Sequence, residues 1–156
     1  AGAPIVYYTT PEWQKIYAAA HHYFSCKSSM YHYYGTARKN YHEHLTKDLV
    51  KYKKYFYVLR PILACRWIEQ KACPPLVLFQ ELADEVLAPE LKDVVRQLLE
   101  AKMQMSESEK APRIDALNAY IVKELAYYKE AIAAMHDDRT ADWGALNDIF
   151  IQTLEQ

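Results

Sequence analysis

The pattern of apolar and polar positions along this chain of 156 residues predicts helices over most of its length. Apolar residues recur at alternating steps of three and four positions through residues 112–135, so they share one face of an amphipathic helix. Shorter or weaker patterns mark the other segments. The predicted helices cover residues 11–22, 26–45, 48–70, 77–87, a segment starting at 89, 112–135 and 141–154.

Two of these helices have capping residues at their predicted starts. Thr10 precedes Pro11 and Glu12, which places a hydroxyl at the N-cap, a proline at the first helical position and an acid in the first turn. Ser25 can cap the next helix in the same way. The sequence therefore predicts that helices begin directly after residues 10 and 25.

The segment 48–70 differs from the others because it is apolar nearly all round from Tyr55 to Ile68. A helix without a polar face is buried on all sides, so this helix is expected at the centre of the molecule. Pro61 lies inside it and removes one backbone hydrogen bond, which predicts a kink. We expect a single all-α domain, residues 1–156, in which about seven helices pack as a compact bundle around this central Pro-kinked helix.

Glycine is scarce, and its scarcity excludes several classes of protein. The chain has three glycines, of which Gly35 and Gly144 are internal. They cannot form a phosphate-cradling GxGxxG or GxxxxGKS loop, and no Asn-Gly, Asp-Gly or Gly-Gly hairpin turn is present. Gly35 falls inside a predicted helix, where glycine costs about 1 kcal/mol relative to alanine. We therefore expect a packed helix or a ligand to approach the backbone there.

Charge is divided unevenly between the two halves of the chain. Residues 1–78 carry eleven Lys/Arg and four Asp/Glu, a net +7, whereas residues 79–156 carry eight and sixteen, a net −8. Eleven of the fourteen tyrosines also lie within the first 57 residues. Basic residues among aromatics suit nucleic acid, because rings stack on bases while Lys and Arg neutralise phosphates. The alternative is that the two halves neutralise each other by packing together.

Two arginines stand out because the segment around them is apolar. Arg60 and Arg66 lie within the predicted central helix, and a buried guanidinium needs a partner. An acid, such as Glu69 or one from the second half of the chain, can pair with either arginine. In the functional alternative, both arginines point at a phosphate group.

The sequence contains no constellation typical of metal binding or nucleophilic catalysis, so no catalytic residue is predicted. His21-His22 and His42-Glu43-His44 are adjacent or two apart, whereas two helical ligands of one ion need spacings of three or four. Three cysteines without a CxxC pair indicate a reducing cytosol and hence a cytoplasmic protein. No apolar run approaches the roughly 18 residues of a membrane span, so no membrane partner is expected.

Arg38 and His44 have the R-x5-H spacing of the HEPN-type ribonucleases, which are all-α proteins. In those enzymes Arg holds the scissile phosphate and His acts on the ribose hydroxyl, a proton transfer that imidazole can perform near neutral pH. The pattern is short, and it arises easily by chance in a chain with six histidines. An HEPN-like ribonuclease is therefore kept as an alternative function.

Several segments, taken together, resemble one family. The most distinctive is the block KKYFYVLRPILACRWIE, which is long and unusual. The matching segments are residues 3–7, 23–25, 31–45, 53–69 and 74–75, with a weaker match at 113–121. In these segments the chain resembles the C-terminal helical region of predicted nucleotidyltransferases of the DNA polymerase β superfamily, the RNA-repair-associated type. The resemblance does not extend to residues 122–156.

The resemblance implies a parent enzyme with an N-terminal catalytic domain that carries a Gly-Ser turn and paired aspartates. The aspartates would bind two Mg²⁺ ions and the turn a nucleoside triphosphate, for in-line nucleotidyl transfer. Neither element matches this chain, so no cofactor is expected within it and it is not catalytic alone. We expect the C-terminal part of a longer enzyme, with that N-terminal domain as partner, or a stand-alone relative that lost catalysis.

Position and composition suggest which residues contact a substrate. The expected role is substrate binding and scaffolding, in which a basic and aromatic face contacts nucleotide phosphates or an RNA end. An alternative function belongs to a different class of protein: a non-catalytic helical module that binds an acidic protein or a second copy of itself. The candidate phosphate contacts are Arg38, Lys53, Lys54, Arg60 and Arg66, and the candidate base-stacking residues are Tyr31, Tyr33 and Tyr57.

Overall fold

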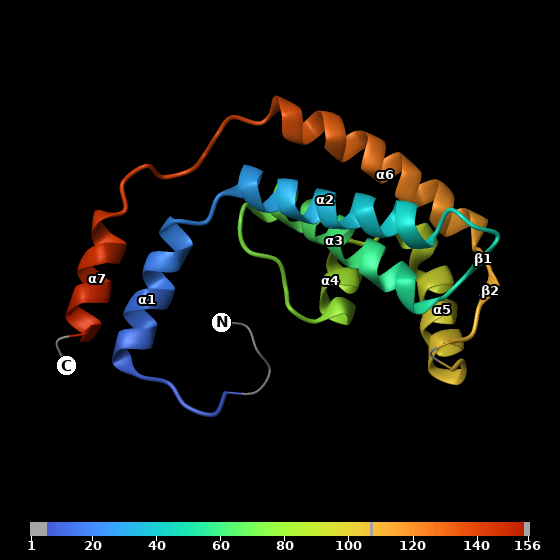
Figure 1. Ribbon diagram of the computed structural model, residues 1–156, viewed down its shortest axis with the longest axis horizontal. Helices are drawn as coiled ribbons and strands as arrows, with labels where there is room; N and C mark the ends of the chain where they lie inside the picture. Colours follow the sequence, from blue (N-terminus) through green and yellow to red (C-terminus); the bar gives the residue numbers. More distant parts are fainter. Residues whose placement is uncertain (1–5, 107, 155–156) are drawn as a thin grey trace.

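The computed structural model describes residues 6–106 and 108–154 of the chain. This part holds seven α-helices, one 3₁₀ turn and two strands of two residues each (Figure 1), so the all-α prediction is confirmed. Within it, no helix is both long and apolar enough to span a bilayer. The elements in order are α1 (Pro11–His22), α2 (Cys26–His44), β1 (Leu49–Val50), α3 (Lys53–Lys71), α4 (Phe79–Val86), η1 (Pro89–Leu91), α5 (Lys92–Gln104), β2 (Ala111–Pro112), α6 (Asp115–Ala134) and α7 (Gly144–Leu154).

Both predicted helix caps are formed. The Thr10 hydroxyl accepts a hydrogen bond from the backbone N–H of Trp13 at 3.1 Å, and the Ser25 hydroxyl accepts one from Ser28 at 3.0 Å. Each bond satisfies an N–H group that the first turn of a helix leaves without a backbone partner. Local sequence therefore fixes where α1 and α2 begin.

Helix α3 forms the centre of the molecule, as its apolar sequence predicts. Helices α2 and α6 pack against α3 and against each other, and α4 packs against α3 as well (Figure 1). We call α2 to α6, with the strands and the 3₁₀ turn, the body. The buried side chains of α3 are Tyr55, Val58, Leu59, Pro61, Ile62, Leu63, Ala64, Cys65 and Ile68.

The central helix begins later than its predicted start near residue 48. Leu49–Val50 pair antiparallel with Ala111–Pro112, and the Arg113 N–H donates to the Asp48 carbonyl at 2.9 Å. Extended backbone that pairs with another segment cannot belong to a helix, so α3 starts at Lys53. The same pairing delays α6, which begins three residues after its predicted start. The predicted boundaries were wrong because the two strands lie about 60 residues apart in the sequence.

Gly35 has open space beside it. A β-carbon built at this position meets no atom within 4 Å, apart from its own helix and chain neighbours. The expectation that a packed helix approaches the backbone at Gly35 is therefore wrong for the described residues.

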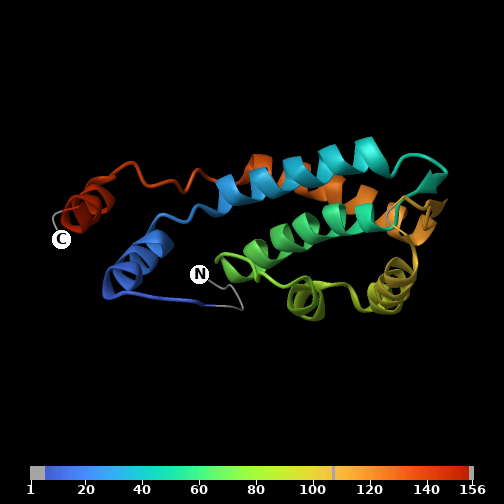
Figure 2. The same cartoon turned by 60° about the horizontal axis from the view of Figure 1, so that its bottom comes forward.

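Helices α1 and α7 lie side by side at one end of the molecule, away from the body (Figures 1 and 2). No residue of either helix is buried. Tyr23, directly after α1, and Trp143, directly before α7, stack on each other, with ring centroids 5.5 Å apart and planes 19° from parallel. We call α1 and α7 the arm.

Candidate phosphate-binding site

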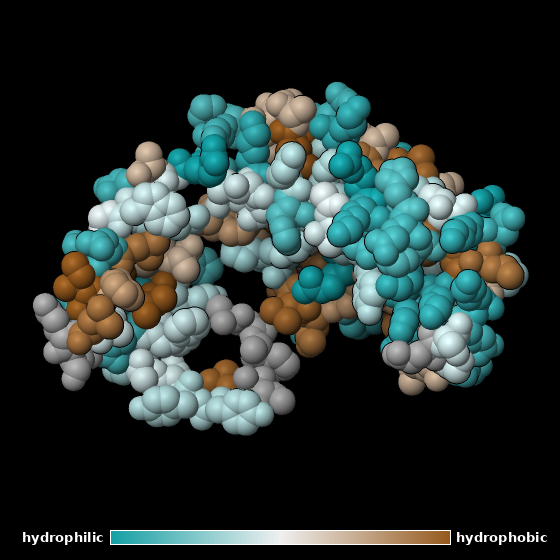
Figure 3. All heavy atoms as spheres, in the orientation of Figure 1, coloured by the Kyte–Doolittle hydropathy of each residue, from teal (hydrophilic) through white to brown (hydrophobic). Residues whose placement is uncertain are grey.

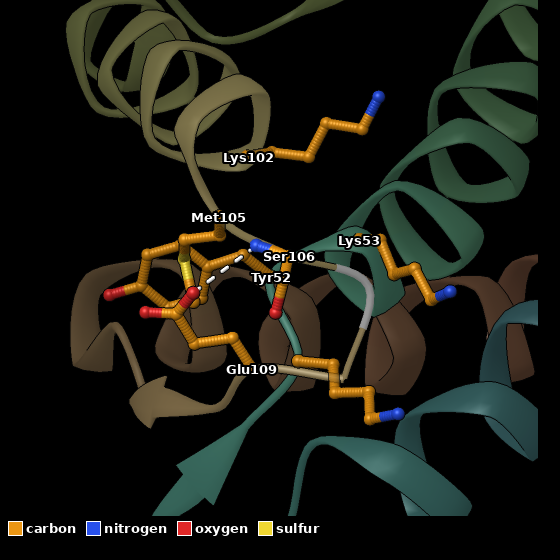
Figure 4. A pocket seen from close by; sticks show the side chains of 7 residues that line it. Tyr52, Lys53, Lys102, Met105, Ser106 and Glu109 are labelled. Carbon is orange, nitrogen blue, oxygen red and sulfur yellow. Dashed lines mark hydrogen bonds between the residues drawn. The ribbon is translucent and has the colours of Figure 1, made fainter.

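A small basic pocket lies at the start of α3, where α5 and the segment after it approach. Its volume is about 50 Å³, which leaves room for one small group rather than a whole nucleotide. In Figure 4 the amino groups of Lys53 and Lys102 lie on one side of the pocket, and Tyr52, Met105 and Glu109 on the other. The described residues that line it are Lys51, Tyr52, Lys53, Lys102, Met105, Ser106 and Glu109.

The charge around this pocket favours an anion. Three lysines and one glutamate are present among the lining residues that the structure describes. The pocket lies at the N-terminus of α3, the positive end of the helix dipole. The first turn of α3 contains no acid, and its N-cap residue, Tyr52, makes no side-chain capping bond. Several positive groups thus line one pocket, and the first turn of α3 itself contributes no acid to it.

Lys54 and Tyr57 extend this basic end of α3 toward solvent. The Lys54 amino group lies 4.8 Å from the centre of the Tyr57 ring, within the range of a cation–π contact. Tyr57 is about half exposed, so part of its ring is accessible to solvent. Of the predicted site residues, Lys53, Lys54 and Tyr57 are the three that the structure brings together.

Arg60 lies one turn further along α3, where it holds a loop. Its guanidinium donates hydrogen bonds to the carbonyl oxygens of Val77 at 2.8 Å and Leu76 at 3.4 Å. These two residues belong to the segment between α3 and α4. Among the described residues, Arg60 therefore has backbone carbonyls as partners, which explains how its charge is accommodated near an apolar helix.

Arg66 is half-buried and faces α6, close to Tyr120 and Glu124. Burial disfavours the charge of its guanidinium, but these two neighbours outweigh burial and raise the Arg66 pKa. Burial also raises the pKa of Tyr120 to about 12 and raises the pKa of Glu124, although Arg66 acts in the opposite direction on both groups. This environment favours the structural alternative for Arg66, in which an acid from the second half of the chain is its partner.

The predicted site residues of α2 lie apart from the pocket. Arg38 is exposed, with its guanidinium 5.9 Å from the Tyr34 ring centre, and Tyr31 is 70% exposed. Tyr33 is half-buried against the core, so it presents less of its ring for stacking. His44 has Glu43 as a neighbour at 3.5 Å. On one continuous helix, Arg38 and His44 are about 120° apart in direction and about 9 Å apart along the axis.

Sequence reasoning missed two of the lysines that line the pocket. Lys51 lies two residues before the predicted Lys53 in the basic run KYKK, and this run indicates that Lys51 belongs to the same basic cluster. Lys102 comes from the last turn of α5, about 50 residues further along the chain. No local pattern links Lys102 to α3, so only the folded chain brings it to the pocket.

The described residues show no metal centre. Within residues 6–106 and 108–154, no three His, Cys, Asp or Glu side chains are grouped so that they could hold an ion. The chemistry that the described site supports is anion binding.

The sequence matches one known family over nearly its whole length. The model of the RNA repair pathway DNA polymerase beta family (RlaP) matches residues 1–152. The chain belongs to this family. The match includes α6 and nearly all of α7, so the expectation that the family resemblance ends near residue 121 is wrong. The RlaP match covers nearly the whole chain rather than a short motif.

The chain is also similar to a bacterial protein that is longer than this chain. YcgL, an uncharacterized protein of Bacillus subtilis (strain 168), is 38% identical over 157 residues, which cover 97% of this chain and 59% of the relative. The chain thus spans about three-fifths of the length of that relative. No solved structure matches this RlaP chain.

Proposed function

We propose that this RlaP chain is the helical substrate-binding and scaffolding part of a nucleotidyltransferase, and that its basic pocket holds a terminal phosphate of RNA. One observation carries the proposal: Lys51 and Lys53, directly before and at the start of α3, and Lys102 from the last turn of α5 line one pocket the size of one small group. Charged partners of phosphate are usually lysine and arginine, aided by helix N-termini. The RNA-repair family supports RNA as the molecule that carries this phosphate.

The catalytic step itself is assigned to another part of the parent enzyme. Nucleotidyl transfer of the polymerase β type uses carboxylates that hold two Mg²⁺ ions and a nucleoside triphosphate. We assign those groups to an N-terminal nucleotidyltransferase domain, for which the additional length of the Bacillus relative leaves room. Three unpaired cysteines fit a cytosolic enzyme.

The test compares a short single-stranded RNA with and without a terminal phosphate. Replacing Lys51 and Lys102 together by alanine removes two pocket charges, so the affinity for the phosphorylated RNA should fall at least tenfold. The slope of log affinity against log salt should become shallower by about one to two. Lys123→Ala, an exposed lysine on α6, is the matched control and should leave the affinity unchanged. Equal binding by the double variant and the control would remove the pocket from the site.

The HEPN-like alternative receives no support from the geometry of α2. A single active site needs Arg38 and His44 to point at one phosphodiester, and their directions on α2 diverge. RNA cleavage by the pure chain that disappears in His44→Ala would nevertheless establish this activity. Cleavage that is absent, or equal in both proteins, excludes it.

A further inference from the structure

The arm has an exposed apolar surface that its own two helices cannot stabilise. In Figure 3, hydrophobic side chains gather over α7 at the left of the molecule. Helices of 11 and 12 residues are marginal in water unless an apolar face is buried against a partner. The exposed large apolar side chains of the arm are Trp13, Tyr17, Trp143, Phe150, Ile151 and Leu154.

A groove connects the arm to the body. It lies between α1 and the segment that follows α3, and its volume is about 590 Å³. We call it the arm groove. The rim includes His21 and Glu81, and none of the described residues that line it is a lysine or an arginine. The apolar side chains that define it are Trp13, Ile16, Tyr17, Phe24, Pro75 and Leu76.

The chemistry of the arm groove indicates which class of molecule it binds. Nucleic acid needs lysine or arginine for its phosphates, and the described residues that line the groove include neither. Aromatic and aliphatic side chains with few charges are typical of the centre of a protein–protein interface. The occupant is therefore a protein surface with apolar side chains, and RNA belongs to the basic pocket at the start of α3.

Chain length and connectivity point to one protein partner. The 157 matched residues are 59% of the Bacillus relative, so about 110 of its residues lie outside the match, which is the usual size of one domain. The chain enters the arm through residues 6–10, directly before α1. The family resemblance implies that the nucleotidyltransferase domain precedes this helical region. A domain in that place would be tethered within about 35 Å of α1, because ten extended residues reach no further. Such a tether raises the effective concentration of the domain at the arm groove.

We propose that the arm and the arm groove form the docking surface for the nucleotidyltransferase domain, through apolar contacts centred on Trp13 and Tyr17. This inference rests on the proposed function, because the nucleotidyltransferase domain is the partner that the proposed function names. The arm groove is lined by residues 73–77, which follow α3, whereas the basic pocket is lined by residues 51–53 at the start of α3. The described residues that line the two sites are entirely different. The docked domain and the RNA phosphate thus occupy separate sites.

The experiment measures binding between two separate polypeptides. One is this chain of 156 residues, and the other is the part of the Bacillus relative that lies outside the match. Isothermal titration calorimetry should detect a complex for the unchanged chain. The double variant Trp13→Glu/Tyr17→Glu should weaken it at least thirtyfold, because charges replace two apolar anchors. Val122→Glu, an equally exposed apolar position on α6, is the matched control and should bind as the unchanged chain does.

Neither exchanged side chain of α1 is buried, so the double variant should keep its helix content in circular dichroism. Three results would overturn the inference: no complex with the unchanged chain, equal binding by the double variant, or self-association of the chain that the double variant abolishes. Phosphorylated RNA is titrated into the same samples. If RNA binding persists while docking fails, the docking surface alone is wrong. If docking persists while RNA binding fails, the proposed function is wrong.

Discussion

The body and the arm have similar sequence patterns but opposite environments. Helix α6 carries a stripe of apolar residues, and Leu117, Ile121, Tyr128 and Ile132 within it are buried. Helix α7 carries a comparable stripe, yet Phe150 is 61% exposed, and no residue of α7 is buried. An apolar stripe therefore shows that a helix has a face to bury, but it does not show which surface covers that face.

The difference in burial between the body and the arm also separates side chains that stabilise the fold from side chains that can contact a partner. Side chains in the body are surrounded on all sides, so their contribution to folding is large. No side chain of α1 or α7 is buried, and the exposed large apolar ones keep about two-fifths or more of their surface in water, so they are available to a partner. The predictions below test this division, from the largest expected effect on stability to the smallest.

The sharpest test replaces one large apolar side chain in each region by alanine. Leu63 is fully buried in α3, so Leu63→Ala should lower the free energy of unfolding by about 3 kcal/mol, through lost apolar burial and a cavity. Phe150→Ala in the arm should lower it by less than about 0.5 kcal/mol, because the ring is mostly exposed. Urea denaturation measures both changes. A comparable loss in the two variants would mean that the arm is buried in solution.

Asn118 links three segments of the body. Its side chain accepts a hydrogen bond from the Tyr55 hydroxyl and donates one to the Leu45 carbonyl, both at 2.8 Å. Asn118→Ala removes the acceptor of the Tyr55 hydroxyl and the donor to the Leu45 carbonyl, so the free energy of unfolding should fall by about 2 kcal/mol. Asn147→Ala on the exposed α7 is the control for loss of the same side chain, and its effect should be small. Similar urea midpoints for the two variants would contradict this role.

Asp138 lies in the segment between α6 and α7 and fastens this segment to the start of α2. It accepts hydrogen bonds from the Ser25 hydroxyl at 2.5 Å and the Cys26 N–H at 2.6 Å. Partial burial opposes ionisation of Asp138, but these hydrogen bonds outweigh burial and lower its pKa. The carboxylate also lies at the N-terminus of α2, which favours negative charge.

Asp138→Asn should therefore reduce stability at neutral pH by about 1 kcal/mol, the usual contribution of a capping group. Because the folded pKa lies below the unfolded one, this contribution is present above the unfolded pKa and is lost as pH falls through the folded value. Thermal unfolding from pH 7 to acid should show the gap between protein and variant closing below about pH 4. Asp148→Asn on α7 controls for removal of a charge. A gap that stays constant with pH would show that ionised Asp138 is not responsible.

The smallest effect is a gain in stability at Gly35. Space for a β-carbon is open there, so Gly35→Ala should raise the free energy of unfolding by roughly 0.5 to 1 kcal/mol through helix propensity. Gly144→Ala at the start of α7 is the matched arm variant, and its β-carbon would meet the Asp142 carboxylate at 3.1 Å. Differential scanning calorimetry compares the two. If Gly35→Ala stabilises the fold but weakens RNA binding, the open face of α2 takes part in the site.

The candidate site was partly visible in the sequence. Lys53, Lys54 and Tyr57 lie within one turn of a helix, so spacing alone places them together. Arg60 and Arg66 were chosen because they stand in an apolar segment, and the structure surrounds them with the α3–α4 loop and α6 instead. A sequence shows that a charge needs a partner, but the partner is chosen by which segment packs opposite.

Local sequence by itself determined the all-α class, the caps of α1 and α2, and the burial of α3. These features depend on residues within a few positions of each other, where hydrogen bonds and apolar spacing act directly. The tertiary structure alone decided the β1–β2 pairing, the approach of Lys102 to the start of α3, and the exposure of α7's apolar face. Each of these depends on a contact, or a missing contact, between segments far apart in the chain, and no local pattern encodes which distant segments meet.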